Sequence, residues 1–331
     1  MAQAILPSNI QDPTGQDRRE RACIAEFSRR VRRVRQVYVE VLRQLPHTTV
    51  TVNADRTDYD APPELLTLLL EWARKQVNSI LLDRVPAETP IASVPGVVPR
   101  AGATVGTPAT AAPDPRMWLI EAGVEPAYAQ GTAQQVSNLT VQSREYALTR
   151  PNIETVINSP PYRTRLELLR ERVSTSLKGF AEEVSTRMSL VLQGGLAVGK
   201  NPLAIADDLA QAAGVSQSKA QLIARTEVPG ALRAARLAEA DQAAADLGLV
   251  SLEMHLSACS PTTRQTHYAR MGTLHTTQEQ REWWDKDGNR YNCKCSTVTV
   301  LLDENGKPRY PGVITRAMKI KADNPLPTRK V

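Results

Sequence analysis

The chain has 331 residues, with 41 lysines and arginines against 35 acidic residues and a net charge of +6. No apolar run approaches the roughly 20 residues that a membrane span needs, and the first residues do not resemble a secretory signal, so we expect neither a membrane protein nor an exported one. Four cysteines in a chain this long indicate a reducing compartment, where cysteines are more often metal ligands or buried thiols than disulfides.

The first predicted element is a long helix over residues 17–45. Its apolar residues recur at alternating steps of three and four, which is typical of a helix docked in a groove or a coiled coil. Residues 18–35 hold eight arginines against two glutamates, so this segment accounts for the net charge of the chain. The arginines form either a solvated face or a surface for an acidic protein or DNA phosphates. The predicted contact residues are Arg29, Arg30, Arg32, Arg33 and Arg35.

A second helix is predicted over residues 62–83. Residues 84–116 then hold seven prolines and three glycines, a composition typical of a semi-rigid extended strap that forms no core of its own. We divide the chain into a helical docking region (1–83), the strap (84–116), a helical body (117–248) and a small α+β domain (249–331).

The helical body contains a long amphipathic helix from Pro160 to Gly194-Gly195, followed by two shorter helices over 202–213 and 217–246. Beyond Gly248 the pattern shifts to short alternating segments, with a strand over 296–302 and a turn at residues 303–306. The predicted fold class is therefore mainly α with a small C-terminal α+β unit and an elongated helical body of several segments.

Two motifs in this body have competing interpretations. Residues 194–200 have the glycines and lysine of a phosphate-binding loop, but Asn201 stands where Ser or Thr would bind magnesium, so a glycine-rich connection between helices is favoured. Residues 202–225 resemble a helix-turn-helix with its corner at Gly214-Val215-Ser216. Their second helix is rich in alanine, so a packed corner is favoured over reading of DNA.

A cluster of metal-binding residue types lies near the C-terminus. Three cysteines and a histidine fall within 37 residues, and this donor set suits a tetrahedral zinc site. The alternative is a small core with buried thiols, because no Cys-x₂-Cys pair is present. His255 and His275 are reserve ligands, and zinc is the only cofactor that the sequence predicts. The predicted ligands are Cys259, His267, Cys293 and Cys295.

The order of several short motifs carries a family resemblance. Ala224-Arg225-Thr226-Glu227 is followed by Thr263-Arg264-Gln-Thr-His267, then by Gly272 and Trp283-Trp284, and finally by Asn292-Cys293-Lys294-Cys295. From about residue 160 the chain thereby resembles the phage Mu F-like minor head proteins, or phage head morphogenesis proteins. Arg264 is one candidate partner for Glu227. The motif residues expected to be structural are Arg225, Thr226, Glu227, Arg264 and Gly272.

The resemblance implies a structural protein of a tailed phage virion that is not an enzyme. Such proteins associate with the portal vertex in the head, after assembly in the host cytoplasm, and assist head morphogenesis and DNA packaging or ejection. The implied partners are the portal protein, the major capsid or scaffold protein, and packaged DNA bound without sequence preference. Two alternatives stay open: a DNA-binding protein that uses the Arg-rich helix and the helix-turn-helix-like corner, and a zinc-dependent hydrolase or effector carried by the phage.

Overall fold

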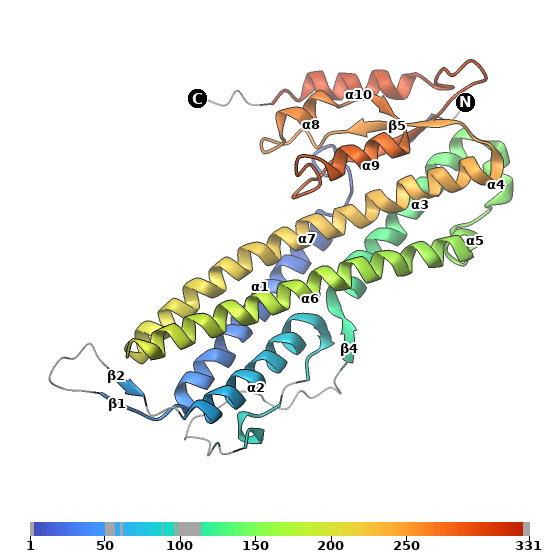
Figure 1. Cartoon of the computed structure of the whole chain (residues 1–331). Helices are drawn as coiled ribbons and strands as arrows, with labels where there is room; N and C mark the ends of the chain where they lie inside the picture. Colours follow the sequence, from blue (N-terminus) through green and yellow to red (C-terminus); the bar gives the residue numbers. More distant parts are fainter. Residues whose placement is uncertain are drawn as a thin grey trace. The chain divides into compact units, whose positions relative to one another are not determined.

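A computed structural model describes residues 3–49, 57–59, 62–87, 89–95, 97 and 114–326. Helices dominate these residues (Figure 1), and the predicted class, mainly α with a small α+β unit near the C-terminus, is confirmed. None of the described helices has the length and apolar character to cross a membrane. The helices are α1 (Asp17–Gln44), α2 (Pro63–Leu82), α3 (Glu125–Gln142), α4 (Arg144–Thr149), α5 (Ile153–Ile157), α6 (Pro160–Ala197), α7 (Pro202–Leu247), α8 (Gln265–Ala269), α9 (Thr277–Asp285) and α10 (Gly312–Asp323).

The strands are short and pair in separate small sheets. β1 pairs with β2, β3 with β4, and the C-terminal sheet has the order β6-β5-β7 with antiparallel neighbours. A turn of 3₁₀-helix covers Ile91–Ser93, and a π-helical turn, Ile120–Val124, leads into α3. The strands are β1 (His47–Thr49), β2 (Thr57–Tyr59), β3 (Asp83–Val85), β4 (Asp114–Met117), β5 (Ser251–Leu256), β6 (Leu274–His275) and β7 (Ser296–Leu301).

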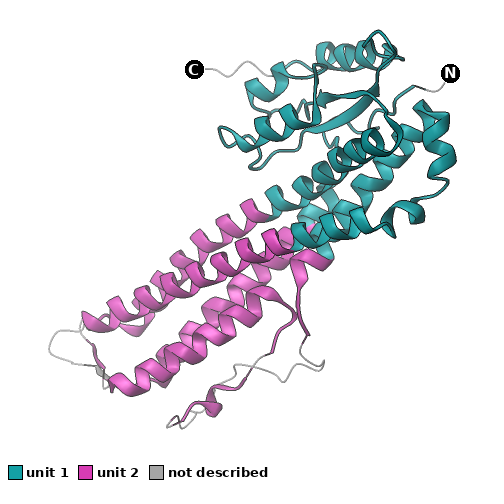
Figure 2. Cartoon of the chain, turned by 45° about the vertical axis from the view of Figure 1, so that its right-hand side comes forward, with its two compact units in different colours: residues 1–21, 122–170, 224–331 teal, residues 22–121, 171–223 magenta. Residues whose placement is uncertain are grey.

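The chain forms two compact units, each assembled from segments that are far apart in the sequence (Figure 2). Helices α1, α6 and α7 each contribute residues to both units. The division into four consecutive regions that the sequence analysis made stays a prediction. Unit 1 comprises 1–21, 122–170 and 224–331, and unit 2 comprises 22–121 and 171–223.

In unit 2, the apolar seam of α1 is buried by the chain's own helices. The Phe27 ring meets the rings of Trp118 and Phe180 edge-on, at centroid distances of 4.7 and 6.0 Å, and the Tyr38 hydroxyl donates to the Ser185 carbonyl oxygen at 2.9 Å. The groove in which this seam was expected to dock is formed by helices of the same unit, so the seam is not open to a partner protein. The buried seam residues are Phe27, Val31, Val34, Tyr38, Val41 and Leu45.

The first part of the predicted strap lies against α2. Thr89 accepts a hydrogen bond at its carbonyl oxygen from Trp72 Nε1 at 3.2 Å, and Ile91 and Val94 are buried. The two ends of the strap form the β3–β4 pair, in which Asp83 is opposite Met117. The middle of the strap, residues 98–113, lies outside the described residues.

The predicted helical corner does not exist, because α7 runs without a break from Pro202 to Leu247 and even contains Pro229. Gly214 is helical and exposed, while the flanking Ala213 and Ser216 are buried, so packing outweighs the weak helix propensity of one glycine. The prediction of a helix-turn-helix-like corner is therefore wrong.

The glycine-rich stretch at residues 194–200 is the end of α6 and the turn into α7, as the sequence favoured. Its lysine, Lys200, forms an ion pair with Asp208, and the Gly199 carbonyl oxygen accepts from the Thr57 amide at 2.8 Å. The lysine thus pairs with an aspartate of the helix that directly follows it.

In unit 1, the C-terminal sheet has two different faces. Met254 and Val298 are paired across β5 and β7 and belong to an apolar core with Val313 and Ala317 of α10. The opposite face carries Glu253, His255 and Thr299, which are polar and fully buried. The predicted strand and its turn are confirmed, since Gly306 N donates to the Asp303 carbonyl oxygen at 3.0 Å.

Helix α3 covers the polar face with side-chain amides. Gln135 Nε2 donates to Thr299 Oγ1 at 2.6 Å, and Asn138 Nδ2 donates to the Thr299 carbonyl oxygen at 2.9 Å. Helix α3 also packs closely on α7, because a Cβ atom at Gly131 would lie 2.4 Å from the Leu232 carbonyl oxygen. Unit 1 therefore joins its sheet to its helices through hydrogen bonds between buried polar groups as well as through apolar contacts.

Candidate functional site

Several residues of the family motifs meet around one loop, residues 286–295, which we call the Cys-Lys-Cys loop. They are Thr226, Glu227, Arg264 and His267. Asp287, Gly288 and Asn292 have positive φ angles of 52°, 67° and 51°. Asp, Gly and Asn are the residue types that adopt this left-handed region most readily, so the sequence suits the sharp bends. Two turn hydrogen bonds close the loop, from Asn289 N to Lys286 O at 2.9 Å and from Tyr291 N to Gly288 O at 3.1 Å.

Helix α7 supports this loop from one side. Thr226 Oγ1 accepts from the Asn292 amide at 3.2 Å, and Glu227 pairs with Arg290 at 3.5 Å. Arg225 faces elsewhere and approaches Glu20 of α1 at 3.6 Å. Arg225 and Glu227 therefore anchor different segments, as expected for two residues two positions apart on a helix, while Thr226 and Glu227 hold the same loop.

Arg264, immediately before α8, holds the loop from another side. Its guanidinium donates to three main-chain carbonyl oxygens, those of Gly288 at 3.0 Å, Asn289 at 2.7 Å and Tyr291 at 3.1 Å. The planar five-donor group of arginine suits such a set of divergent acceptors. The suggested pairing of Arg264 with Glu227 is wrong, since Arg264 binds carbonyl groups.

Gly272 is required by a tight turn beside β6. Its φ is +82°, and a Cβ atom there would lie 2.6 Å from Met318 Sδ. Its amide donates to the His255 carbonyl oxygen at 2.9 Å. Glycine is therefore needed for the backbone conformation, whereas the flexible and exposed side chain of Met318 could move aside.

Three of the four predicted zinc ligands come together. The ligand atoms of His267, Cys293 and Cys295 lie within 4.8 Å of one another, and all three residues are buried. His267 Nδ1 is 3.4 Å from both sulfur atoms. The cluster joins α8 to the end of the Cys-Lys-Cys loop.

The fourth predicted ligand, Cys259, is not part of this group. It packs in the apolar core of the sheet with Met254, Leu256 and Met271, and burial raises the pKa of its thiol. Proximity in the sequence placed it in the predicted set, but the turn at residues 259–263 directs it to the other cluster. Of the four predicted ligands, His267, Cys293 and Cys295 lie together and Cys259 does not.

The reserve histidines lie outside the group as well. His255 is fully buried on β5, with Nδ1 3.3 Å from Gln280 Oε1, and burial lowers its pKa to about 3. The ring of Trp283 contacts both His255 and His267, at centroid distances of 4.9 and 4.6 Å. His275 is 2.7 Å from Thr273 Oγ1 at the sheet edge.

The sequence analysis missed two side chains that position the cluster. Arg233 of α7 is buried, stacks on Trp284 at 4.8 Å, and donates from Nη1 to the carbonyl oxygens of Cys293 at 2.8 Å and Cys295 at 3.3 Å. Asn289 places its Oδ1 3.2 Å from His267 Nε2. No pattern of residue types distinguishes either one, although Arg233 lies two helical turns after Arg225.

The surroundings favour one thiolate in the cluster. A hydrogen bond from Cys295, the neighbouring His267 and the positive Arg233 hold the pKa of Cys293 well below its usual value. The pKa of Cys295 is raised well above the usual value, because its thiol donates to Cys293 and is buried. Burial also lowers the pKa of Arg233.

Four of the five predicted contact arginines of α1 are exposed, and one is not. Arg30 is buried and donates to the carbonyl oxygens of Ile80 at 2.6 Å and Asp83 at 2.7 Å, at the end of α2. It also stacks over the Trp118 ring at 4.9 Å. The prediction that Arg30 contacts a partner is wrong, because its guanidinium donates hydrogen bonds to carbonyl oxygens that have no partner within the helix at the end of α2. The exposed ones are Arg29, Arg32, Arg33 and Arg35.

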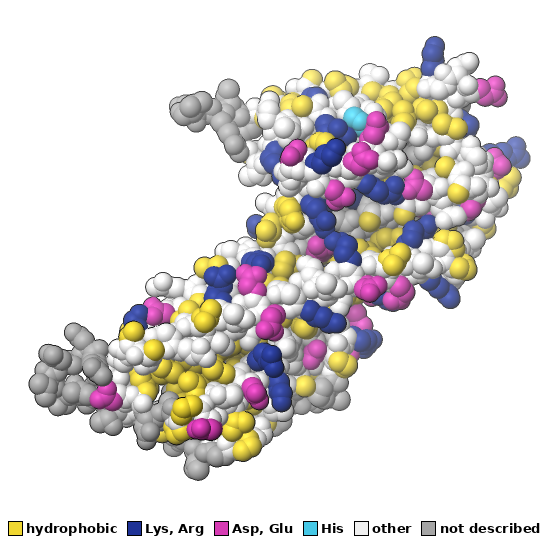
Figure 3. Space-filling model, viewed as in Figure 1, with side chains coloured by type: hydrophobic (Ala, Val, Ile, Leu, Met, Phe, Trp, Pro, Cys, Tyr) yellow, Lys and Arg dark blue, Asp and Glu magenta, His cyan; other side chains and the backbone are white. Residues whose placement is uncertain are grey.

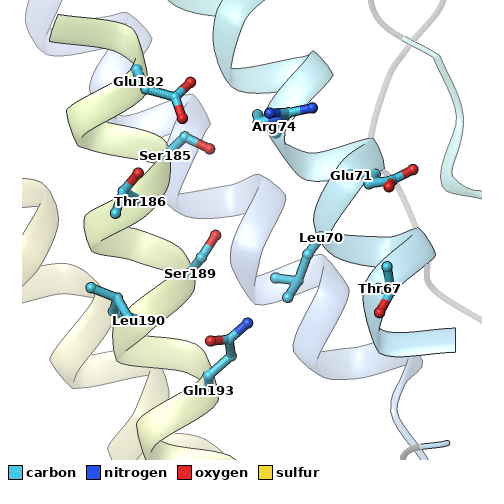
Figure 4. Close-up of a pocket in the computed structure, with 10 residues that line it drawn as sticks. All are labelled: Thr67, Leu70, Glu71, Arg74, Glu182, Ser185, Thr186, Ser189, Leu190 and Gln193. Atoms are coloured by element: carbon cyan, nitrogen blue, oxygen red, sulfur yellow. The ribbon is translucent and has the colours of Figure 1, made fainter. Parts of the chain in front are cut away.

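Unit 2 also contains a hollow of about 360 Å³ between α2 and α6 (Figure 4). One stripe of each helix lines it, including Glu71 and Arg74 of α2 and Glu182 of α6. Of its hydroxyl groups, Ser185 and Ser189 lie 3.2 and 3.1 Å from the Tyr38 hydroxyl. This lining serves the packing of α1 on α6, so the Cys-Lys-Cys loop remains the candidate site.

Fold and site together describe a mainly helical protein whose C-terminal sheet and loop are held by buried arginine, cysteine and histidine contacts. Residues 186–298 match the family model described as Phage Mu protein F like protein, which covers the motif residues on α7, α8 and the Cys-Lys-Cys loop. The match confirms the resemblance to the Mu F-like phage head morphogenesis family over these residues and supports a phage head-related protein. No curated protein and no solved structure matches the chain.

Proposed function

We propose that this chain is a minor head protein of a tailed phage that associates with the portal vertex and assists head assembly and DNA packaging or ejection, without turnover of a substrate. The observation that carries the proposal is the family match over residues 186–298. The motif residues within that range support the proposal. Thr226, Glu227 and Arg264 use their side chains for hydrogen bonds and an ion pair with one loop of the same unit. Such contacts serve the stability of a structural protein.

The exposed arginines of α1 are the proposed contact surface for an acidic portal surface or packaged DNA. The seam of α1 is buried, so the partner must bind the opposite side of that helix, where Arg32 and Arg35 are exposed. On the face drawn in Figure 3, basic and acidic side chains are interspersed. A row of arginines on one helix is thus a local feature, and phosphate contacts by it would depend strongly on salt.

The alternative of a sequence-specific DNA-binding protein required a helix-turn-helix in residues 202–225. These residues form part of the continuous helix α7, so no separate recognition helix is present there. The hydrolase alternative would place catalysis at the His267, Cys293 and Cys295 cluster, where all three side chains are buried. Replacing His267 by alanine distinguishes the hydrolase from the structural head protein. In a hydrolase the variant should lose catalytic turnover, whereas in a head protein it should lower the stability of unit 1.

The main experiment measures the protein in particles of the phage that encodes it. Purified heads should contain a few copies per particle, and crosslinking in procapsids should link the chain to the portal protein in preference to the major capsid or scaffold protein. Deleting the gene should yield defective heads or particles that fail to deliver DNA. Particles that lack the protein, or normal infective heads after deletion, would refute the proposal.

A charge-reversal pair tests the contact surface. Arg32→Glu with Arg35→Glu should weaken binding to the portal protein or reduce the salt dependence of non-specific DNA binding. Arg144→Glu with Arg163→Glu is the matched control, because both are exposed arginines on other helices. Equal losses in the two pairs would show that net charge, not the face of α1, matters. Tight binding that prefers one DNA sequence at about 150 mM salt would instead support the DNA-binding alternative.

A further inference from the structure

We propose that His267, Cys293 and Cys295 bind one Zn²⁺ ion through His267 Nδ1 and the two sulfur atoms. Two thiolates and an imidazole nitrogen are the donor types that zinc prefers. The inference concerns the stability of the C-terminal unit and stands apart from the proposed role in the phage head.

The distances suit a single tetrahedral ion. Usual Zn–S and Zn–N bond lengths place a sulfur and a nitrogen ligand about 3.6 Å apart around such an ion. His267 Nδ1 lies 3.4 Å from each of the two sulfur atoms. Closing the three donors on one ion therefore requires only a small adjustment.

Asn289 sets the ring of His267 in the form that binds metal. Its Nδ2 group donates to the Trp283 carbonyl oxygen at 3.0 Å, which orients the amide so that Oδ1 faces His267 Nε2 at 3.2 Å. An amide oxygen can only accept a hydrogen bond, so His267 Nε2 must be the donor and carries the hydrogen. His267 Nδ1 then presents its lone pair toward the two sulfur atoms. A hydrogen bond to the second ring nitrogen is the common support of a histidine that binds metal.

The two thiols are held from the other side. Arg233 donates to the carbonyl oxygens of both Cys293 and Cys295, which fixes the backbone that carries the two sulfur atoms. The positive charge of Arg233 also suits a site with thiolate ligands.

Three protein ligands leave a fourth position. Within the described ranges, no further Cys, His, Asp or Glu belongs to this group, and Cys259 packs in a different core cluster. We therefore assign the fourth position to a small ligand such as water. The three protein ligands tie α8 to the end of the Cys-Lys-Cys loop, and the ion is a cross-link within unit 1.

The test uses the full chain, purified under reducing conditions with zinc present and then dialysed without chelator. Elemental analysis should find one zinc per chain. The variants Cys293→Ser, Cys295→Ser and His267→Gln should each retain less than about a tenth of that amount, while Cys259→Ser and Cys23→Ser should retain all of it. Cys23 and Cys259 are matched controls, since both are buried cysteines outside the cluster.

A measurement on the unmodified chain guards against variants that fail to fold. Cobalt substituted for zinc should show thiolate charge-transfer absorption and the intense visible bands of a four-coordinate ion. Titration with a mercurial reagent should release the zinc as two thiols react. Zinc-free wild-type protein after reconstitution, equal loss of zinc in Cys259→Ser, or a disulfide between Cys293 and Cys295 in the reduced preparation would each overturn the assignment.

Discussion

Arg264 Nη2 lies 2.7 Å from the carbonyl oxygen of Asn289, so the arginine of one family motif fixes the residue that orients the histidine of the same motif. Asn289 in turn places Oδ1 3.2 Å from His267 Nε2. The Thr-Arg-x-x-His order thus has a physical basis: arginine holds the loop, and histidine, three residues later, receives the side chain which that loop presents. Gly288 and Tyr291 accept from the same guanidinium and complete the arrangement.

Replacing Arg264 by alanine should lower the free energy of unfolding by roughly 2–3 kcal/mol, because three carbonyl groups lose a charged donor. Lysine should rescue only part of the loss, since one ammonium group cannot reproduce the planar donors. Urea denaturation gives the comparison, with Arg281→Ala as the control. Arg281 forms a surface ion pair with Asp241, so replacing it by alanine should lower the free energy of unfolding by less than about 1 kcal/mol. Equal effects of the two alanine variants would contradict this role.

Replacing Gly214 by alanine should stabilise the protein by about 0.5–1 kcal/mol. Gly214 lies inside the continuous α7, and a Cβ atom there would meet nothing within 4 Å. Alanine has the higher helix propensity and lowers the entropy of the unfolded chain. Thermal melts of the two proteins decide the matter, and a lower melting temperature for the variant would indicate that the helix bends at this position after all.

The sequence specified the helices that its periodicity and prolines delimit, but not the way in which distant segments combine. Predicted helices over 17–45 and 62–83 correspond to α1 and α2 because apolar spacing and proline act locally. The helix break expected at Gly214 is absent, because burial of the neighbouring residues stabilises the helix more than one glycine destabilises it. The two units are interleaved along the chain, and no composition change reports such long-range packing.

The site was predictable in its chemistry and not in its geometry. His267, Cys293 and Cys295 were recognised by residue type, while the inclusion of Cys259 came from sequence proximity, which says little about distance after a turn. The roles of Arg233 and Asn289 were not predictable, because their partners are main-chain carbonyl groups and a ring nitrogen. Every residue offers a carbonyl group, so such contacts leave no signature in the sequence.

Replacing Arg30 by alanine should destabilise unit 2 by roughly 3 kcal/mol. The change removes the donors for the carbonyl oxygens of Ile80 and Asp83 at the end of α2 and the stacking on Trp118. Buried acceptors without donors carry most of the cost. Arg32→Ala is the matched control on the same helix, because Arg32 is exposed and its loss should change stability by less than about 0.5 kcal/mol. Unfolding curves that coincide for the two variants would disprove the capping role.

His255 should make the protein less stable as the pH falls below about 6.5. Burial lowers its pKa from 6.5 to about 3 in the folded protein, so between these values the unfolded chain binds a proton that the folded chain does not. The free energy of unfolding therefore decreases by up to about 1.4 kcal/mol for each pH unit below 6.5 and is unaffected by this group above it.

Other groups titrate in the same range, so the measurement must isolate His255. Buried Glu253 has a raised pKa and acts in the opposite direction, because it makes the folded state less stable as pH rises above 4.5. Urea unfolding of the wild type and of His255→Gln at about pH 7.5 and about pH 5 removes this background by difference. The wild type should lose about 2 kcal/mol more than the variant between the two conditions. Parallel losses would mean that His255 accepts a proton within the fold, through a rearrangement that exposes its Nε2 atom to water.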